Sequence, residues 1–409
     1  MEQTKITLSD GKTFTKSIPR LPSWGKYDDS LIDLHSVANS LFISEEYVNY
    51  SNEISRVEIP LRCDLPSNLK EALEDLYIEL FHYTPVFSSS SKQISLKNPK
   101  GSWANGFTCL FSCGLDSYVG ILSASELFPV TGAFTHHPDF RTLPSRADII
   151  RAKILKPKGI ELRTIRAPDH HKAMKLTRGV LYVLNAALLR NKNIIVPEIG
   201  PTMYQPPFTL LDELSITTRP QILQAAIKIT EAITGQRIKI IKPNEDLTKA
   251  EVAAISPNPE FIKETHSCRT PRWANSDRSH CGSCYGCVVR RLATKVAGVS
   301  DGQYRKDGFT GRGVDNISQL IKFSIDFLSD PQTLPTYTSE IINKYHKQEL
   351  FKRFALDNLA GLMLMSDKHI ENNVQRKLME LTLSAIDRGE LNDRIEVVRS
   401  KSRKPNFLN

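Results

Sequence analysis

The sequence predicts an α/β protein built around a parallel sheet. The first observation is an alternation of strand-like and helix-like segments between residue 101 and about residue 254. The second is a strand–loop–helix unit over residues 107–127, at the start of this alternation. The third is composition, since 40% of the 409 residues are hydrophobic and 24% are charged, as in globular proteins of two or three domains. We expect helices on both faces of the sheet and a ligand site beyond the carboxyl ends of its strands.

The elements of this central region are predicted from apolar runs and from helical spacing of apolar residues. The expected strands cover residues 107–111, 130–135, 160–165, 193–196 and 238–241. The expected helices cover residues 118–127, 144–155, 177–190 and 220–233.

The two flanking regions do not alternate in this way. Before the sheet we expect a small α+β extension that docks on or covers the next domain, with a strand within 54–66, a helix over 66–83 and a linker or exposed loop at 88–92. After it we expect a helical region that forms a cap or a partner surface, with helices at 317–328, 339–362 and 373–388 and a mobile basic tail at 399–404. The predicted division is therefore residues 1–100, 101–300 and 301–409.

The net charge is +9, from 54 basic and 45 acidic residues. A basic surface favours phosphate-bearing partners such as ATP or nucleic acid, although most of these charges belong to ordinary solvated surface. No apolar run reaches the roughly 18 residues of a membrane span. The N-terminus lacks the basic-then-apolar layout of a secretion signal, so we expect a cytoplasmic protein with no membrane partner.

The loop of the strand–loop–helix unit has the residue types of a phosphate cradle. Its residues are Ser112, Cys113, Gly114, Leu115, Asp116 and Ser117. The free N–H groups of a helical first turn, together with the partial positive charge of the helix end, bind anions. The alternative is an ordinary turn between a strand and a helix.

A second helix start is marked by a capping box. Thr248 and Glu251 have the required spacing, and Lys249 then lies in the first turn. A lysine at a helix N-terminus is unfavourable unless it faces an anion. Lys249 is therefore either a ligand-facing residue or a solvated surface lysine.

Four of the seven cysteines cluster in the sequence, at Cys268, Cys281, Cys284 and Cys287. Four thiolates satisfy tetrahedral Zn²⁺ with no open position, which indicates a structural metal. An iron–sulfur cluster would use the same ligands. His266 and His280 flank the cluster and could replace one cysteine, but four cysteines suffice.

Together the loop and the cysteines resemble a known family. Residues 112–117 resemble the S-G-G-x-D-S signature of the PP-loop ATP pyrophosphatases, and the cysteine spacing resembles the zinc site of the QueC-type 7-cyano-7-deazaguanine synthases. The segments 177–179, Pro243 and 247–251 are similar to QueC segments in the same order. The resemblance spans about residues 105–298, and the additional terminal regions resemble the QueC-like proteins of antiphage defence, of the QatC kind.

This resemblance implies a Rossmann-like PP-loop fold, of the adenine nucleotide alpha-hydrolase-like type, and an ATP-dependent C–N ligase. It implies that ATP adenylates the carboxylate of a deazaguanine-type small molecule, which then reacts with ammonia or with an amine of a protein partner from the same defence operon. It implies Zn²⁺ at the four cysteines, and that Asp116 coordinates Mg²⁺ or orients the loop. In this scheme the pyrophosphate is held by the loop residues 112–117, Lys249 and Arg178 neutralise phosphate charge, and Gly200, with Glu198 and Ile199, lies beside the substrate.

Two departures from the family leave alternatives open. Cys113 replaces a glycine, and a positive φ there would cost a cysteine on the order of 1 kcal/mol. His136, His137 and Asp139 stand where the family has a substrate-recognition segment, and His136, His137, His170 and His171 form either a polar site or two exposed loop pairs.

The first alternative function is a tRNA-thiolating PP-loop enzyme. It would use Cys113 at a helix N-terminus, where the pKa of a thiol is lowered. Cys109, within the expected strand, should point into the core and would then not supply a second reactive thiol. The second alternative is a catalytically inactive nucleotide-binding partner protein.

Overall fold

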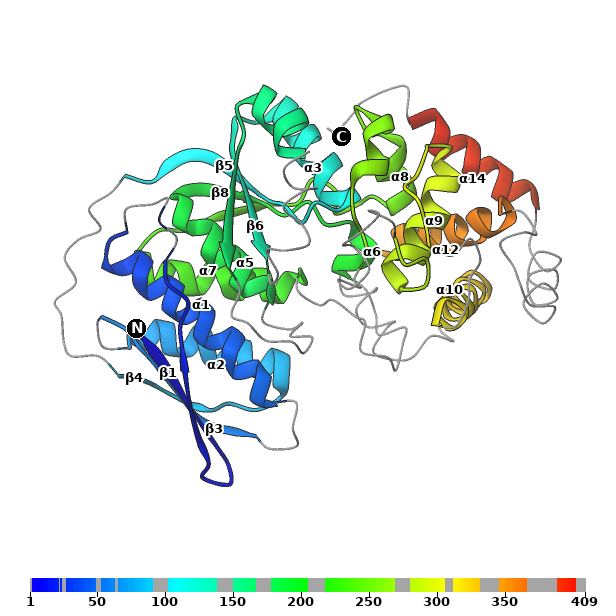
Figure 1. Cartoon of the computed structure of the whole chain (residues 1–409). Coiled ribbons are helices and arrows are strands. Elements are labelled where there is room, and N and C mark those ends of the chain that lie inside the picture. Colours follow the sequence, from blue (N-terminus) through cyan, green and yellow to red (C-terminus); the bar gives the residue numbers. More distant parts are fainter. Residues whose placement is uncertain are drawn as a thin grey trace.

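The computed structural model arranges the chain around two sheets and a group of C-terminal helices (Figure 1). It describes residues 2–21, 23, 27–48, 53–62, 65–90, 102–137, 150–166, 178–204, 218–268, 280–305, 312–331, 346–365 and 388–401. Across these ranges no helix is long and apolar enough to cross a bilayer. The proposed domain boundaries stay a prediction.

The central sheet is parallel, as predicted. Its strands are β5 (Ala104–Leu110), β6 (Val130–His137), β7 (Glu161–Arg166), β8 (Asn191–Ile195) and β9 (Lys239–Ile241). They lie in the order β7-β6-β5-β8-β9, and every pair is parallel. The order therefore reverses between β5 and β8, which creates a crevice outside the carboxyl ends of these two strands.

Helices lie between these strands and after the last of them, β9. They are α3 (Leu115–Leu127), α5 (Arg178–Ala186), α6 (Gly200–Met203), α7 (Pro220–Thr234) and α8 (Lys249–Ala254). Right-handed crossovers put α3 on one face of the sheet and α5 and α7 on the other, because the chain reverses direction across the sheet after β7. The structure describes only residues 150–155 of the helix expected at 144–155. Ile150 is helical, and a π-helical turn follows over Arg151–Leu155.

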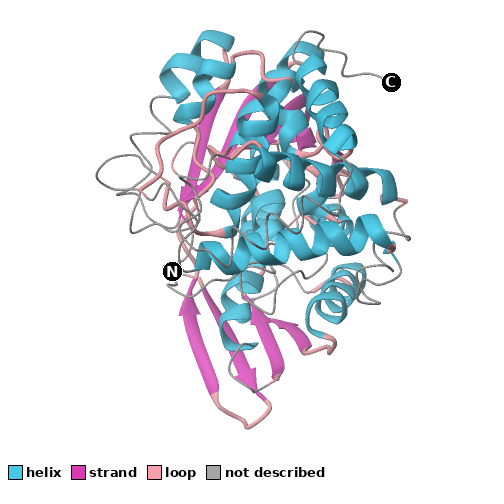
Figure 2. Ribbon diagram, turned by 90° about the vertical axis from the view of Figure 1, so that its right-hand side faces the viewer, coloured by secondary structure: helices cyan, strands magenta, loops and turns pink. Residues whose placement is uncertain are grey.

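The N-terminal region is the expected α+β unit, with a mixed sheet (Figure 2). Its strands are β1 (Gln3–Leu8), β2 (Thr13–Ser17), β3 (Ile54–Ile59) and β4 (Val86–Ser89), in the order β2-β1-β3-β4, with only the β3–β4 pair parallel. Two helices accompany it, α1 (Asp29–Val48) and the predicted α2 (Ser67–Phe81). The linker expected at 88–92 is wrong at its start, because Ser88 and Ser89 pair with β3; residues 91 and 92 lie outside the described ranges.

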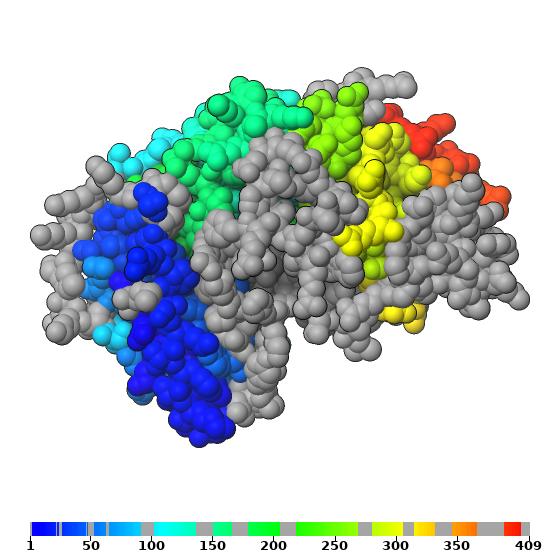
Figure 3. Space-filling view, in the orientation of Figure 1, coloured from blue at the N-terminus to red at the C-terminus, as the bar shows by residue number. Residues whose placement is uncertain are grey.

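This unit docks on the helices that cover one face of the central sheet. α1 contacts α5 and α7, and α2 contacts α7. Within the interface the buried His35 ring nitrogen Nδ1 lies 2.8 Å from Asn185 Oδ1, and Arg190 forms a 2.8 Å ion pair with Asp28. In Figure 3 the N-terminal sheet reaches below the rest of the molecule.

The C-terminal region contributes helices beside α8. They are α10 (Arg312–Ser329), α12 (Gln348–Met363) and α14 (Arg388–Lys401), and they pack with α9 (Tyr285–Ala297). The expected basic tail is wrong at its first residues, because Arg399 and Lys401 lie in α14 and Lys401 Nζ is 3.0 Å from Glu251 of α8. Residues 402–404, and the helix expected at 373–388 apart from Arg388, lie outside the described ranges.

A glycine is required where α6 meets the C-terminal region. A Cβ added to Gly200 would lie 2.0 Å from the Glu245 carbonyl oxygen and 2.4 Å from Leu350 of α12. The chain that follows β8 therefore passes directly between the Glu245 backbone and α12.

Gly200→Ala should lower the free energy of unfolding by about 1–3 kcal/mol, since the backbone that it meets cannot move cheaply. Gly132→Ala is the matched control, because its Cβ would meet its nearest atom, in Leu189, at an ordinary 3.4 Å. Urea unfolding of both variants measures the difference, and equal stability would contradict this packing.

Candidate functional site

The loop between β5 and α3 has the expected strand–loop–helix arrangement. α3 begins at Leu115, three residues before the predicted start, with Gly114 as its N-cap residue. Ser112 Oγ accepts a 3.4 Å hydrogen bond from the Gly114 N–H, and Ser117 Oγ donates one of 3.0 Å to the Gly114 carbonyl. The two serine hydroxyls are 3.2 Å apart, so both face the same small volume at the start of the helix.

Cys113 adopts the left-handed conformation at the centre of this loop, with φ of 61°. A side chain in this region costs about 1–2 kcal/mol, and a glycine would not incur that cost. The residue is only 2% exposed and packs in the hydrophobic core, and its carbonyl accepts a 2.8 Å hydrogen bond from the His266 N–H. The cysteine therefore keeps a backbone shape that suits glycine, with its side chain turned away from solvent.

Lys249 lies at the first position of α8, directly after the capping box. Both hydrogen bonds of the predicted box are present, between Thr248 and Glu251. Lys249 is 8% exposed, and its Nζ lies 2.5 Å from Asp116 Oδ2. It is therefore not a solvated surface lysine, and it joins α8 to the loop after β5.

Glu198 adds a second carboxylate to this pair. It follows β8, on the other side of the crevice from Asp116. Burial, followed by the charge of Asp116, raises the pKa of Glu198 to about 7, although Lys249 acts in the opposite direction. The resemblance implies no role for Glu198 beyond its place beside the substrate. An acidic residue directly after a strand, where the strand order reverses, is the feature of the sequence that indicates one.

Asn244 forms hydrogen bonds with both sides of the crevice. It is fully buried, and its side-chain amide donates hydrogen bonds to the Pro197 carbonyl at 2.9 Å and the Asp116 carbonyl at 3.3 Å. Gly120 of α3 lies so close to Pro197 that an added Cβ would be 2.3 Å from the proline Cβ. The carboxylates of Asp116 and Glu198 are thus held on fixed backbone.

The carboxylate pair fits a hard cation. Asp116 Oδ1 is buried and has no hydrogen-bond partner among the described residues. Glu198 is half-buried beside it. Two carboxylates with an unused oxygen are the ligand type that Mg²⁺ prefers, usually together with substrate phosphates.

Several other predicted site residues are placed only in part. Arg178 begins α5 and Gly200 begins α6, but the Arg178 side chain lies outside the described residues. His136 and His137 end strand β6, so they do not form the expected loop pair, and their side chains lie outside the described residues. Their partners in the register are Ile165 and Arg166. Asp139, His170 and His171 lie outside the described ranges.

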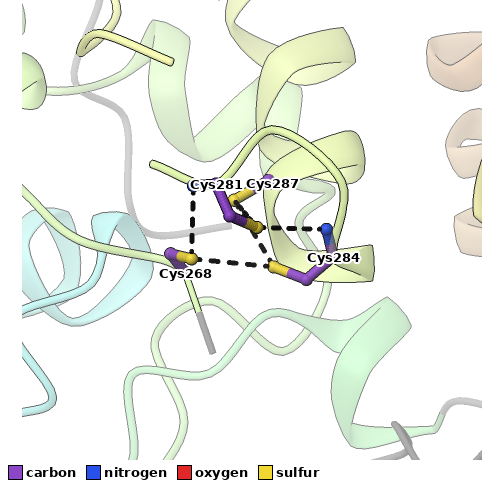
Figure 4. Close-up of side chains that lie close together, drawn as sticks. All are labelled: Cys268, Cys281, Cys284 and Cys287. Atoms are coloured by element: carbon purple, nitrogen blue, oxygen red, sulfur yellow. Dashed lines mark hydrogen bonds between the residues drawn. The ribbon is translucent and has the colours of Figure 1, made fainter. Parts of the chain in front are cut away.

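The four predicted cysteines converge on one point (Figure 4). Their Sγ atoms all lie within 4.8 Å of one another, and the closest approaches are 3.4 Å for Cys284–Cys287, 3.7 Å for Cys281–Cys287 and 4.0 Å for Cys268–Cys284. A tetrahedral Zn²⁺ with bonds of about 2.3 Å needs sulfur atoms about 3.8 Å apart. The cluster is therefore consistent with a zinc site. Backbone N–H groups of Cys281 and Cys284 also donate to Sγ of Cys268 and Cys281, at 3.5 and 3.3 Å.

The surrounding residues bring the two cysteine segments together. Cys284 is the N-cap residue of α9, and Cys287 lies in its first turn. Gly286 permits close approach of the Cys268 segment, because an added Cβ would lie 2.5 Å from the Ser267 carbonyl oxygen. The buried Arg290 of α9 donates to the carbonyls of Ile262 at 2.7 Å and Thr265 at 3.2 Å. The same segment reaches Cys113 through His266, so the metal loop adjoins the loop at residues 112–117.

Comparison with known proteins adds one partial match. Residues 217–298 match the family model described as QueC, queuosine biosynthesis protein QueC. That region contains Lys249 and the four cysteines, whereas the loop at 112–117 lies outside it.

Two similar curated proteins are 7-cyano-7-deazaguanine synthases of Methanococcus maripaludis, strains C5 and C7. They are 32% and 31% identical to the chain over 88 residues. The similarity covers 20% of this chain and 37% of each relative. The chain thus carries a QueC-like region within a longer sequence that the matches do not cover.

Cys284→Ser should release the metal and lower the melting temperature, because a structural zinc contributes on the order of 10 kcal/mol to folding. Wild-type protein should hold one tightly bound ion per chain, measured by elemental analysis after dialysis. Cys113→Gly is the control. Cys113 is outside the cluster, so this variant should keep its bound metal. Less than half an equivalent of zinc and iron in the wild type would overturn the metal assignment.

Proposed function

We propose that this protein is an ATP-dependent C–N ligase that adenylates the carboxylate of a 7-deazaguanine. The observation that carries the proposal is the convergence of Asp116, Glu198 and Lys249 at the reversal point of the parallel sheet. The QueC-like match over residues 217–298 supports the class of substrate. In this proposal residues 101–300 form the catalytic domain, and residues 1–100 and 301–409 are extensions of it.

The first step is attack of the substrate carboxylate oxygen on the α-phosphorus of ATP. The bond from the α-phosphorus to the bridging oxygen of pyrophosphate breaks, and pyrophosphate leaves. The Gly114 N–H and the hydroxyls of Ser112 and Ser117 are placed to hold its oxygens, around the turn formed by Cys113 and Leu115. Donors fixed in advance stabilise the developing charge because they need no reorganisation.

Charged side chains would neutralise the negative charge of the phosphates. Asp116 and Glu198 would hold Mg²⁺, which supplies charge neutralisation to the phosphate oxygens when it is bound. Lys249 would then move its ammonium from Asp116 to a phosphate oxygen, and Arg178 is proposed for the same role. Phosphoryl and adenylyl transfers depend mainly on such positioning and charge compensation.

In the second step an amine nitrogen attacks the acyl carbon, the bond to the AMP oxygen breaks, and the amine loses a proton. We propose that the acceptor is ammonia or an amine of a protein partner, within an antiphage defence system of the QatC kind in the cytoplasm. The long extensions outside the QueC-like match favour a task beyond that of the shorter relatives.

The thiolation alternative is disfavoured by the cysteines. Cys109 is fully buried in β5, and Cys113 is 2% exposed, so neither thiol faces the crevice as an exposed nucleophile. An inactive partner protein is disfavoured by the retained arrangement of Asp116 and Lys249.

Asp116→Asn and Ser117→Ala should each lower ATP-dependent pyrophosphate release by about 100-fold or more, as expected for loss of one preorganised group. Lys242→Gln is a matched control, because Lys242 forms a 2.6 Å ion pair with Glu245 outside the proposed site. Radiolabelled pyrophosphate–ATP exchange in the presence of 7-carboxy-7-deazaguanine measures the effect. Normal exchange in both site variants would overturn the proposal.

Mass spectrometry of a co-encoded protein identifies the acceptor. After incubation with this protein, ATP and 7-carboxy-7-deazaguanine, the partner should gain the mass of the acid minus one water. The control is the same reaction with the Asp116→Asn variant. Formation of a free amide or nitrile from added ammonia, with an unmodified partner, would contradict the protein acceptor and retain the ligase.

A further inference from the structure

We propose that Arg394 and Asp357, from the C-terminal helices, are positioning residues that hold Lys249 in the site. This inference rests on the proposed function of Lys249. Its basis is a buried charge network that binds the start of α8, and in which Asp357 and Arg394 come from outside the QueC-like match.

The helix that carries Lys249 cannot set its own position. α8 has six residues, Lys249–Ala254, and isolated helices of this length are not stable in water. The contacts of the N-cap residue Thr248 therefore set the position of the first helical turn. Lys249 is the residue directly after Thr248.

Both members of the capping box are bound by the C-terminal helices. The Thr248 hydroxyl accepts from the Glu251 N–H at 3.3 Å and donates a short hydrogen bond to the Asp357 carboxylate of α12. Glu251 Oε2 accepts from the Thr248 N–H at 2.9 Å, while Oε1 faces Arg353 and Arg394 at 2.5 and 3.1 Å. Both members of the box are thus bound by residues more than 100 positions away.

Arg394 of α14 joins the two acidic members. Its Nε and Nη2 donate to the two Asp357 oxygens at 2.7 and 3.1 Å, and its Nη1 donates to Glu251 at 3.1 Å. Glu251, Asp357 and Arg394 are all 5% exposed or less. A planar guanidinium that bridges two buried carboxylates fixes both distance and angle, which a lysine cannot do.

A second contact fixes the segment before the cap. Arg353 Nη2 donates to the Asp246 carbonyl at 2.8 Å, and Lys347 forms a 2.6 Å ion pair with the Asp246 carboxylate. The network therefore holds the chain on both sides of Lys249, at residues 246, 248 and 251. A displacement of this backbone would move Lys249 with it.

The test uses Arg394→Gln and Asp357→Asn, with Arg399→Gln as the matched control. Arg399 lies in the same helix as Arg394 but donates to the Val296 and Lys295 carbonyls of α9, at 3.1 and 3.3 Å. Asp357→Asn keeps the size of the side chain, so it gives a folded variant if Arg394→Gln does not fold. All measurements are made well below each variant's melting temperature.

The first readout needs no turnover. Labelling of Lys249 by an amine-reactive reagent, followed by mass spectrometry, should be several-fold faster in both test variants, and hydrogen exchange at residues 249–254 should accelerate. The Arg399→Gln variant should match the wild type in both. Unchanged labelling and exchange in both test variants would overturn the positioning role.

The second readout separates positioning from stability. For a displaced catalytic group kcat should fall by about 100-fold with a much smaller change in the KM for ATP. A purely structural network would lower the melting temperature and leave kcat per folded molecule unchanged, which would also overturn the proposal. If the wild type does not consume ATP, the proposed function fails, whereas the labelling and exchange results still decide whether the network positions Lys249.

Discussion

The ion pair between Lys249 and Asp116 is the interaction on which the site depends. It joins the loop after the first central strand to the start of α8, more than 130 residues later. Removing one partner of a buried pair leaves an uncompensated charge, which costs about 3–5 kcal/mol. Each residue thus constrains where the other can be, and the crevice between β5 and β8 takes its shape from both.

A further acidic group lies beside this pair. Glu198 places a second carboxyl group next to the one ammonium, and burial, followed by the charge of Asp116, raises the pKa of Glu198. A site with surplus carboxylate and an unpartnered buried oxygen at Asp116 favours a cation. A cation and a polyanionic substrate together would restore balance and free the lysine, which explains why the lysine and the acids belong in one crevice.

Local patterns predicted the parts of this site that depend on neighbouring residues. The cysteine spacing, the capping box at Thr248 and the strand–loop–helix unit each involve residues within about one turn or loop, and each is present in the structure. What the sequence did not reveal comes from distant segments. Nothing near Glu251 indicates that Arg394 is its partner, and α1 was not predicted at all, although its residues are largely buried against α5 and α7.

Cys113 illustrates how a local departure can be absorbed by distant contacts. A cysteine with φ of 61° is unfavourable by itself, yet its carbonyl is held by the His266 N–H and its side chain is packed in the core. His266 is two residues from Cys268, so folding of the metal loop also fixes the turn at residues 112–117. The energy that the metal contributes to its own loop would in this way offset a cost of about 1–2 kcal/mol at the phosphate turn. The identity of one loop residue therefore says little about activity, because the backbone shape, which presents N–H groups to an anion, is retained.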